Sequence, residues 1–287
     1  MRTRTGQLLP LGLLLPSIAF LAVLILVPMA QALLLSIVTD GGEFSLAVFQ
    51  GMLADANFSD AWRNTFLLLL LIVPLQVALA LAIALLVNSR FRGHRLFFLI
   101  YTLPLAVSDL AAGLLWLAAF SERGYLNSLL ESAGLIGQPV LWLSFDNFAG
   151  LVTAIVIAES WRTTAMVVLV LVAGLELIPR DVLETAELFG ANRLRRTIDV
   201  VLPLLRPSLQ SALIIRTIFA FQTFAVVFAL AGRNVPVLAG EAYGWYATNQ
   251  DAHIAAAYAV IILALSMVAI IVYLRLLPGP RELEVER

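Results

Sequence analysis

The 287-residue sequence contains no cysteine and no lysine, and only 13% of its residues are charged. Without cysteine, the chain has no catalytic thiol, no thiolate metal ligand and no disulfide. Without lysine, it lacks the residue that grips the terminal phosphates of a nucleotide in the usual P-loop. Any ATP that drives this protein must therefore be hydrolysed by another chain.

The scarcity of charge also limits the partners of the chain. The net charge is −1, which gives no positive footprint for a nucleic acid backbone, so no nucleic acid partner is expected. Hydrophobic residues make up 61% of the sequence, far more than in a soluble globular domain. Membrane lipid is therefore the expected surrounding, with no separate soluble domain.

Six apolar stretches, each near the length that crosses a bilayer as a helix, recur along the chain. They cover residues 11–37, 66–87, 96–120, 148–171, 208–231 and 254–277. Runs this continuous lack the alternation of barrel strands, and a helix satisfies its own backbone polar groups in lipid. The sequence predicts an all-α integral membrane protein with six transmembrane helices in a single domain over 1–287.

A secretory signal is the alternative interpretation of the first stretch, because Arg2 and Arg4 precede it. The uncharged run from Leu8 to Val38 is longer than the apolar region of such a signal. An acidic and glycine-rich tetrapeptide, residues 40–43, follows it instead of an obvious cleavage site. We therefore interpret this stretch as the first transmembrane span.

Arginine is distributed unevenly between the two sides of the predicted bundle. An even number of spans places both termini on one side, and most arginines near the spans fall on that side. These are Arg2, Arg4, Arg90, Arg92, Arg95, Arg180, Arg193, Arg195, Arg196, Arg206, Arg275, Arg281 and Arg287. The opposite loops carry only Arg63, Arg123 and Arg233. Because positive residues accumulate in cytoplasmic loops, both termini are expected in the cytoplasm.

One cytoplasmic segment, residues 176–207, is much longer than the connection between the second and third spans, and such length suggests a function. Pro179 suits the first turn of a helix, and Gly190 can supply a left-handed stop. An apolar stripe at helical spacing lies between them and consists of Val182, Leu183, Ala186 and Phe189. The segment is expected to project a short amphipathic helix from the membrane.

A second helix is expected after the glycine. Asn192 can cap its start, because an asparagine side chain accepts hydrogen bonds from the free backbone N–H groups of the first turn. Pro203 and Pro207 are expected to end it just before the fifth span, because proline lacks the N–H that continues a helix.

The amphipathic helix has two interpretations: it lies flat on the lipid, or it binds a protein partner. Its first part is acidic, with Glu176, Asp181, Glu184 and Glu187. An anionic inner leaflet would repel this charge, so a protein partner is favoured. A groove in that partner could hold the apolar stripe and transmit movement to the attached spans.

The stretch ETAELFGANRLRRTIDVVLPLLRPSL resembles the EAA loop of permeases in binding-protein-dependent ABC importers. The matching positions are Glu184, Ala186, Gly190, Ala191, Leu202, Pro203 and Pro207. Three positions depart from the family pattern: Thr185 replaces the first alanine, Phe189 stands where aspartate usually precedes the glycine, and Thr197 stands where an aromatic is common. These departures concern fine contacts and not the identity of the loop.

Other stretches resemble the sugar branch of that family, which includes maltose, trehalose and glycerol-phosphate importers. They are AGLELIPRDVLETA before the loop, YTLPLAVSDLAAGLLWLAAFSERGYLNSLL at the third span and FQTFAVVFAL in the fifth. The resemblance extends from about Trp62 onward and implies a permease for a sugar or sugar-like solute, such as a monosaccharide, disaccharide or polyol. It also implies the type I importer permease fold in a bacterial plasma membrane.

The family implies a mechanism and partners as well. Two permease subunits each dock a coupling helix into a dimeric ABC ATPase, which holds ATP-Mg, and an extracytoplasmic solute-binding protein delivers the solute. Closure of the ATPase dimer drives alternating access. The ATPase-coupling residues implied here are Glu184, Ala186, Glu187, Gly190 and Ala191, with Glu184 as polar anchor and Gly190 as the turn. The chain itself is expected to bind no cofactor and to hold no catalytic residue.

Four ionisable residues lie within the predicted spans: Asp109, Glu159, Arg162 and Arg216. An unpaired charge in the bilayer costs about 2.5 kcal/mol or more, so each needs a partner or a function. Glu159 and Arg162 are three residues apart and can neutralise each other on one helix face. Structural pairing is favoured for all four, while Asp109 and Arg216 remain candidates for a substrate pathway.

Gln222 is another pathway candidate, together with its neighbours Phe221 and Phe224. An amide among aromatic rings suits the hydroxyls and ring faces of a sugar. Packing within the fifth span is an equally good explanation of these three residues.

Two other classes of protein are alternative interpretations of this sequence. An intramembrane enzyme is disfavoured, because the sequence has no HExxH, no GxSxG and no paired-aspartate motif. His94 and His253 are isolated, so no metal site is expected. A secondary transporter without an ATPase is the stronger rival, since intramembrane charges can couple ions. The coupling-type loop favours the ABC importer.

Overall fold

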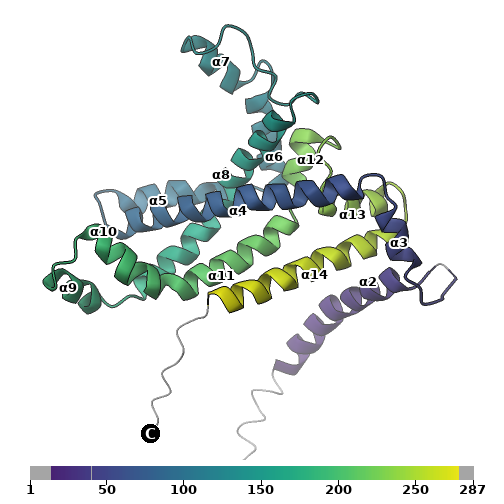
Figure 1. Cartoon of the computed structure of the whole chain (residues 1–287), viewed down its shortest axis with the longest axis horizontal. Coiled ribbons are helices and arrows are strands. Elements are labelled where there is room, and N and C mark those ends of the chain that lie inside the picture. The colour runs from purple at the N-terminus through teal and green to yellow at the C-terminus, as the bar shows by residue number, and fades with distance from the viewer. Residues whose placement is uncertain (1–13, 40, 278–287) are drawn as a thin grey trace, which may run out of the picture. The chain divides into compact units, whose positions relative to one another are not determined.

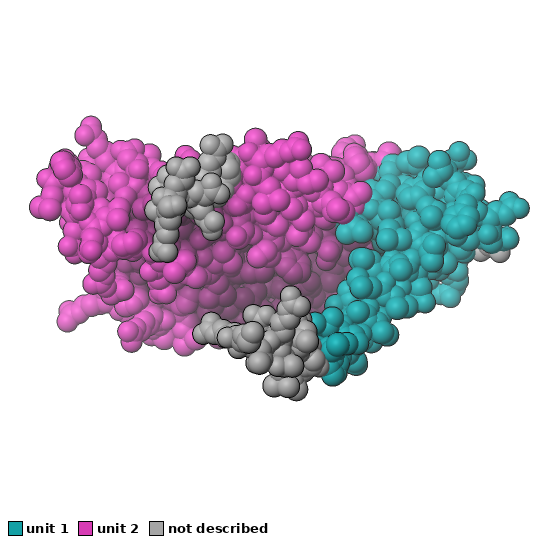
Figure 2. Space-filling view, turned by 90° about the horizontal axis from the view of Figure 1, so that it is seen from below, with its two compact units in different colours: residues 1–58, 241–263 teal, residues 59–240, 264–287 magenta. Residues whose placement is uncertain are grey.

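The computed structural model describes residues 14–39 and 41–277. Expectations for the first residues of the first span and for Arg2, Arg4, Arg281 and Arg287 lie outside these ranges. The described chain divides into two compact units, one made of residues 1–58 and 241–263 and the other of residues 59–240 and 264–287 (Figure 2). We refer to them as unit 1 and unit 2.

Helices account for the secondary structure of the described residues, apart from one isolated bridge between Val38 and Phe44. Five helices in this part of the chain are long and apolar enough to cross a membrane: Leu14–Ile37, α4 (Phe58–Asn88), α8 (Phe148–Glu176), Arg193–Phe221 and α14 (Ala252–Leu276) (Figure 1). A bent pair adds a sixth if it counts as one span. The predicted all-α membrane fold is confirmed.

Unit 1 joins the end of α3 (Ala47–Leu53) to two later helices through one carboxylate. The Oδ2 atom of Asp55 accepts hydrogen bonds from Trp245 Nε1 and Tyr258 Oη, each at 2.7 Å. Trp245 belongs to α13 (Leu238–Ala247) and Tyr258 to α14. The N-terminal span, which contains α2 (Val27–Ile37), contacts α14 through a hydrogen bond: the Leu35 carbonyl lies 2.9 Å from His253 Nδ1.

Helix α8 is the centre of unit 2. Asn147 caps it by accepting a hydrogen bond from the Gly150 N–H at 2.9 Å, and more than half of its most apolar window is buried. Buried residues of α8 contribute to two apolar clusters. One cluster includes α4, α6 (Asp109–Phe120) and α12 (Ala225–Ala231), and the other includes α4 and α11 (Leu202–Phe221). The polar residues of α8 are thus held at fixed positions by packing along nearly its whole length.

The third span is not the continuous helix over 96–120 that the sequence predicted. Helix α5 (His94–Thr102) passes into a short 3₁₀ turn, η2 (Leu103–Ala106), and the chain then bends by 102° before α6. Val107 is extended, and the Ser108 side chain accepts a hydrogen bond from the Ala111 N–H at 3.3 Å. A serine N-cap followed by an acidic first turn therefore starts a new helix inside the apolar run.

The fifth span also differs from its prediction. Pro203 and Pro207 were expected to end a helix, but they lie inside one continuous helix from Arg193 to Phe221. A π-helical segment, η3 (Arg196–Val201), immediately precedes them. Local π geometry changes the hydrogen-bond pattern where proline offers no N–H, which makes proline tolerable in a membrane helix. The helix breaks instead after Phe221, and α12 follows.

Gly174 allows the C-terminal end of α8 and the N-terminal part of α11 to pack closely. A Cβ at this position would lie 2.5 Å from Ser208 Cβ and 3.0 Å from Leu205 Cδ1. Small residues permit such close approach between membrane helices.

We predict that Gly174→Ala destabilises the protein by about 1–3 kcal/mol, because the new methyl group overpacks this crossing. Thermal unfolding in detergent should show a lower midpoint for this variant, and an added Ser208→Gly should recover most of the loss. Gly137→Ala is the control, since nothing lies within 4 Å of the added carbon. Equal midpoints for Gly174→Ala and Gly137→Ala would contradict the proposed close contact.

Candidate functional site

A polar cavity of about 300 Å³ lies in unit 2 where α6, α8 and α11 meet. Its lining residues are Leu105, Asp109, Glu159, Arg162, Thr163, Met166, Arg216, Phe219, Gln222 and Thr223. All four ionisable residues of the predicted spans line it. Three of the five predicted pathway residues, Asp109, Arg216 and Gln222, also come together here.

Arg216 is the central side chain of this site and is only 1% exposed. Its Nη2 lies 3.2 Å from Glu159 Oε2, and its Nε donates a hydrogen bond to Gln76 Oε1. The Gln76 amide in turn donates to the Glu159 carbonyl at 3.0 Å and to Thr163 Oγ1 at 2.6 Å. This network links α4, α8 and α11, so each polar group it contains has a partner away from water.

Arg162 forms the second ion pair of the cavity, with Asp109 of α6. The expectation that Glu159 and Arg162 neutralise each other along α8 was wrong, because each pairs with a residue on another helix. Glu159 and Arg162 share a face of α8, but their ion-pair partners lie on the neighbouring helices α11 and α6. Arg162 Nε is buried and has no hydrogen-bond partner among the described residues. It is therefore a free donor at the cavity wall.

Gln222 sits at a break between two helices rather than in the middle of a span. It is the C-terminal cap residue of α11, and α12 begins three residues later at Ala225, so backbone groups near Gln222 and Thr223 leave the helical pattern. Broken helices at membrane depth are typical of solute sites in transporters. Phe221 instead packs against Phe66 at 5.9 Å between ring centres, and Phe224 packs against Phe228 at 5.5 Å, so neither is among the cavity-lining residues.

The cavity offers both hydrogen-bond donors and acceptors beside apolar surface. Gln222, Thr223 and Arg162 line it together with Phe219 and Met166, and the Thr223 hydroxyl donates a hydrogen bond to the Phe219 carbonyl at 3.4 Å. Two arginines and two carboxylates give the lining no net charge. Such a mixture suits a polyhydroxylated solute, because each hydroxyl both donates and accepts hydrogen bonds and the ring faces are apolar.

Sequence reasoning missed Thr163 and Gln76 as members of this site. Both are polar residues within predicted spans, and that signal was available. Their role became visible only when the folding of α4 against α8 placed them beside Arg216.

The second candidate site is at the end of unit 2 where α9 (Arg180–Leu188) projects beyond α8 and α11 (Figure 1). The helix begins after Pro179 and stops at Gly190, whose φ of +83° is the left-handed conformation expected for a C-terminal glycine. The Asn192 side chain accepts a hydrogen bond from the Arg195 N–H at 2.9 Å, as a helix cap. The sequence predicted α9 and the capped start of the second helix at these positions, but not the continuation of the second helix to Phe221.

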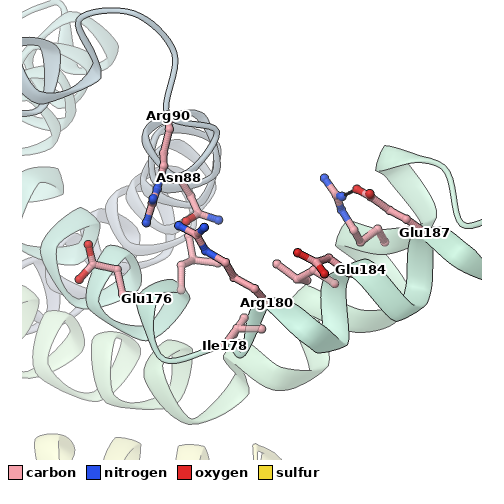
Figure 3. A pocket seen from close by; sticks show the side chains of 10 residues that line it. Asn88, Arg90, Glu176, Ile178, Arg180, Glu184 and Glu187 are labelled. Atoms are coloured by element: carbon pink, nitrogen blue, oxygen red, sulfur yellow. Dashed lines mark ion pairs between the residues drawn. The ribbon is translucent and has the colours of Figure 1, made fainter.

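A cavity of about 560 Å³ separates α9 from the ends of α4 and α8. Asn88, Arg90 and Arg180 point into it from three elements, and Glu184 and Glu187 approach from α9 (Figure 3). Arg90 and Arg180 come from two different connections that the arginine count assigned to the same side of the membrane. The fold brings these two connections together, in agreement with that assignment.

The residues of α9 divide between two faces. Leu183 packs with Ile178 against the second apolar cluster of unit 2, whereas Leu188 and Phe189 are each 88% exposed. The predicted stripe is therefore split: Leu183 anchors α9 to its own unit, and Phe189 is left for another contact. Among the described residues of α9, none is buried.

Comparison with known proteins identifies the family of the chain. Residues 76–282 match the model of the binding-protein-dependent transport system inner membrane component family. The chain belongs to this family of multi-pass ABC transporter permeases.

Two relatives and one solved structure define the resemblance more closely. The chain is 33% identical to the sulfoquinovosyl glycerol transport system permease protein SmoG of Agrobacterium fabrum, over 94% of this chain and 91% of that protein. It is 32% identical to the trehalose/maltose transport system permease protein MalF of Thermococcus litoralis, over 77% and 76%. A chain of a bacterial alginate ABC transporter, solved with its periplasmic protein, has the same fold, with a TM-score of 0.83, 19% identity and coverage of 96% and 97%.

We predict that Arg216→Leu lowers the free energy of unfolding by about 3–5 kcal/mol, because it leaves the Glu159 carboxylate buried without its partner. Thermal unfolding of the detergent-solubilised protein measures the loss, and an added Glu159→Gln should recover part of it. Arg63→Gln is the matched control, since the Arg63 and Asp60 side chains are 69% and 56% exposed. A loss for Arg216→Leu no larger than for Arg63→Gln would show that the buried network contributes little.

Proposed function

We propose that this chain is one of two permease subunits of an ATP-driven importer for a sugar or sugar-like solute. The observation that carries the proposal is a helix at the arginine-rich end of unit 2, α9, whose apolar tip is exposed while its base is packed against the spans. Such a helix can be displaced by another protein and transmit that displacement to the membrane helices.

The polar cavity beside Gln222 supports the solute assignment. Its donors, acceptors and apolar wall fit a carbohydrate, and the relatives named above transport a sulfoquinovosyl glycerol and trehalose or maltose. We infer that the solute passes this cavity, with Gln222, Asp109 and Arg216 among the residues along its path. We assign Phe221 and Phe224 a packing role at the same helix break, not a contact with the solute.

The proposed partners follow from the family. A solute-binding protein delivers the solute from outside, a second permease completes the passage, and a dimeric ABC ATPase binds ATP-Mg and hydrolyses it. The chain itself needs no cofactor for this role. We propose that both termini and α9 lie in the cytoplasm, as the arginine distribution predicts. The meeting of the connections that carry Arg90 and Arg180 at one end of unit 2 supports this orientation.

We assign Glu184, Ala186, Gly190 and Ala191 to the contact with the ATPase, together with the exposed pair Leu188 and Phe189. Glu184 supplies a polar anchor, and the left-handed turn at Gly190 presents the two apolar side chains at the tip. A secondary transporter would have no use for this exposed apolar tip, which is the feature that separates the two functions.

We predict that Phe189→Ser weakens ATPase binding by about 2 kcal/mol, or roughly 30-fold, because an exposed aromatic that enters a partner groove is a typical hot spot. The affinity of the ATPase for permease pairs in proteoliposomes measures this change, and solute-stimulated ATP hydrolysis should fall with it. Glu184→Ala should act in the same direction.

Leu135→Ser provides the control, because Leu135 is 71% exposed in a loop that the proposed topology assigns to the other side of the membrane. It should leave ATPase affinity unchanged. If Phe189→Ser and Glu184→Ala bind the ATPase as tightly as the unaltered chain, α9 is not the contact.

We predict that Gln222→Leu raises the solute concentration needed for half-maximal uptake by about 5–10-fold, the effect of losing one hydrogen bond in a largely dry site. Gln222→Asn keeps an amide and should retain more of the affinity. Transport assays in proteoliposomes with saturating binding protein measure both variants, while ATPase binding serves as the check that assembly is intact. Unchanged transport by Gln222→Leu would remove Gln222 from the pathway.

A further inference from the structure

Helix α9 lies against η3, the start of the following long helix, but none of its residues is buried. Short turns connect it to α8 and to α10 (Arg193–Arg195), and the second turn includes Gly190 in the left-handed conformation. The apolar contact of Leu183 with the second cluster holds one face of the helix. Because these contacts lie on one face and bury no residue of α9, they fix the position of the helix but leave it able to pivot.

A second attachment comes from an ion pair between Glu187 and Arg196, drawn as a dashed line in Figure 3. The side chain of Arg196 is 28% exposed and that of Glu187 is 56% exposed. The pair bridges the turn at Gly190, because Glu187 lies in the last turn of α9 and Arg196 lies beyond the turn. Two attachments at different points prevent the pivoting that one would allow.

Arg196 is also the first residue of η3, which continues into α11 without a break as far as Phe221. The same helix carries Arg216 and ends at Gln222, both on the wall of the polar cavity. The ion pair therefore connects α9 directly to a rod that reaches the cavity. The other covalent connection between α9 and this helix is the backbone turn that contains Gly190.

We propose that the Glu187–Arg196 pair is a latch that makes α9 and α11 move as one body, so that a displacement of α9 reaches the helix break at Gln222. This makes Glu187 and Arg196 positioning residues for transport, and it assigns Glu187 to a contact within the chain rather than to the ATPase surface. The latch rests on the proposed function, since it is the ATPase that would displace α9.

The number of ATP molecules hydrolysed per solute transported tests the latch in the reconstituted transporter. Glu187→Gln and Arg196→Gln should each raise this ratio about fivefold, the effect that an ion pair of this exposure can have on an equilibrium. The leucine contact keeps α9 folded and able to bind the ATPase, so hydrolysis should continue. The exchange Glu187→Arg with Arg196→Glu should restore the original ratio.

Arg193→Gln is the matched control, because Arg193 is an exposed arginine three residues before Arg196 and has no ion pair in the described part of the chain. It should leave the ratio unchanged. The latch is overturned if both single variants keep the original ratio, or if the exchanged pair transports no better than the single variants.

A distance measurement separates a failed latch from a failed function. The chain has no native cysteine, so spin labels at Thr185→Cys on α9 and Ser211→Cys on α11 report the separation of these helices in the purified permease. The distribution should broaden in each single variant and narrow again in the exchanged pair. If transport by the unaltered chain proves not to need ATP, the function is wrong, and this measurement still decides the latch: identical distributions in all variants would overturn it.

Discussion

The burial of Arg216 is the constraint on which much of unit 2 depends. A guanidinium group that is 1% exposed within apolar helices must find acceptors, and it finds them on Gln76 of α4 and Glu159 of α8. Satisfying this one side chain fixes α4, α8 and α11 relative to one another. It also fixes the wall of the cavity, because Arg216 and Glu159 both line it.

The same helix that carries Arg216 links the cavity to the end of unit 2 that carries α9. Its π-helical start adjoins α9, and its far end breaks at Gln222, so its two irregular points lie at the two candidate sites. The intervening helix is continuous even through Pro203 and Pro207. A continuous helix transmits a displacement of one end to the other, which is the physical basis for the proposed coupling between α9 and the polar cavity.

Much of this architecture could be predicted from the sequence, because apolar length and arginine distribution are local signals. The stop at Gly190 and the cap at Asn192 were also predicted, since each depends on the conformational preference of one residue. The partners of Glu159 and Arg162 could not be predicted, because they lie on other helices. The break after Phe221 was missed because residues 222–224 contain no proline or glycine and interrupt an otherwise apolar run by only two polar residues. The prolines that suggested a break, Pro203 and Pro207, instead lie within a helix whose π-helical segment ends just before Pro203.

The central claim is that α9 meets an ATPase through its exposed tip. Because the chain has no native cysteine, a thiol crosslinker placed at Phe189→Cys in the assembled transporter tests this contact directly. We expect the crosslinker at position 189 to form a covalent product with the ATPase subunit. Products with the solute-binding protein or within the permease, and none with the ATPase, would contradict it.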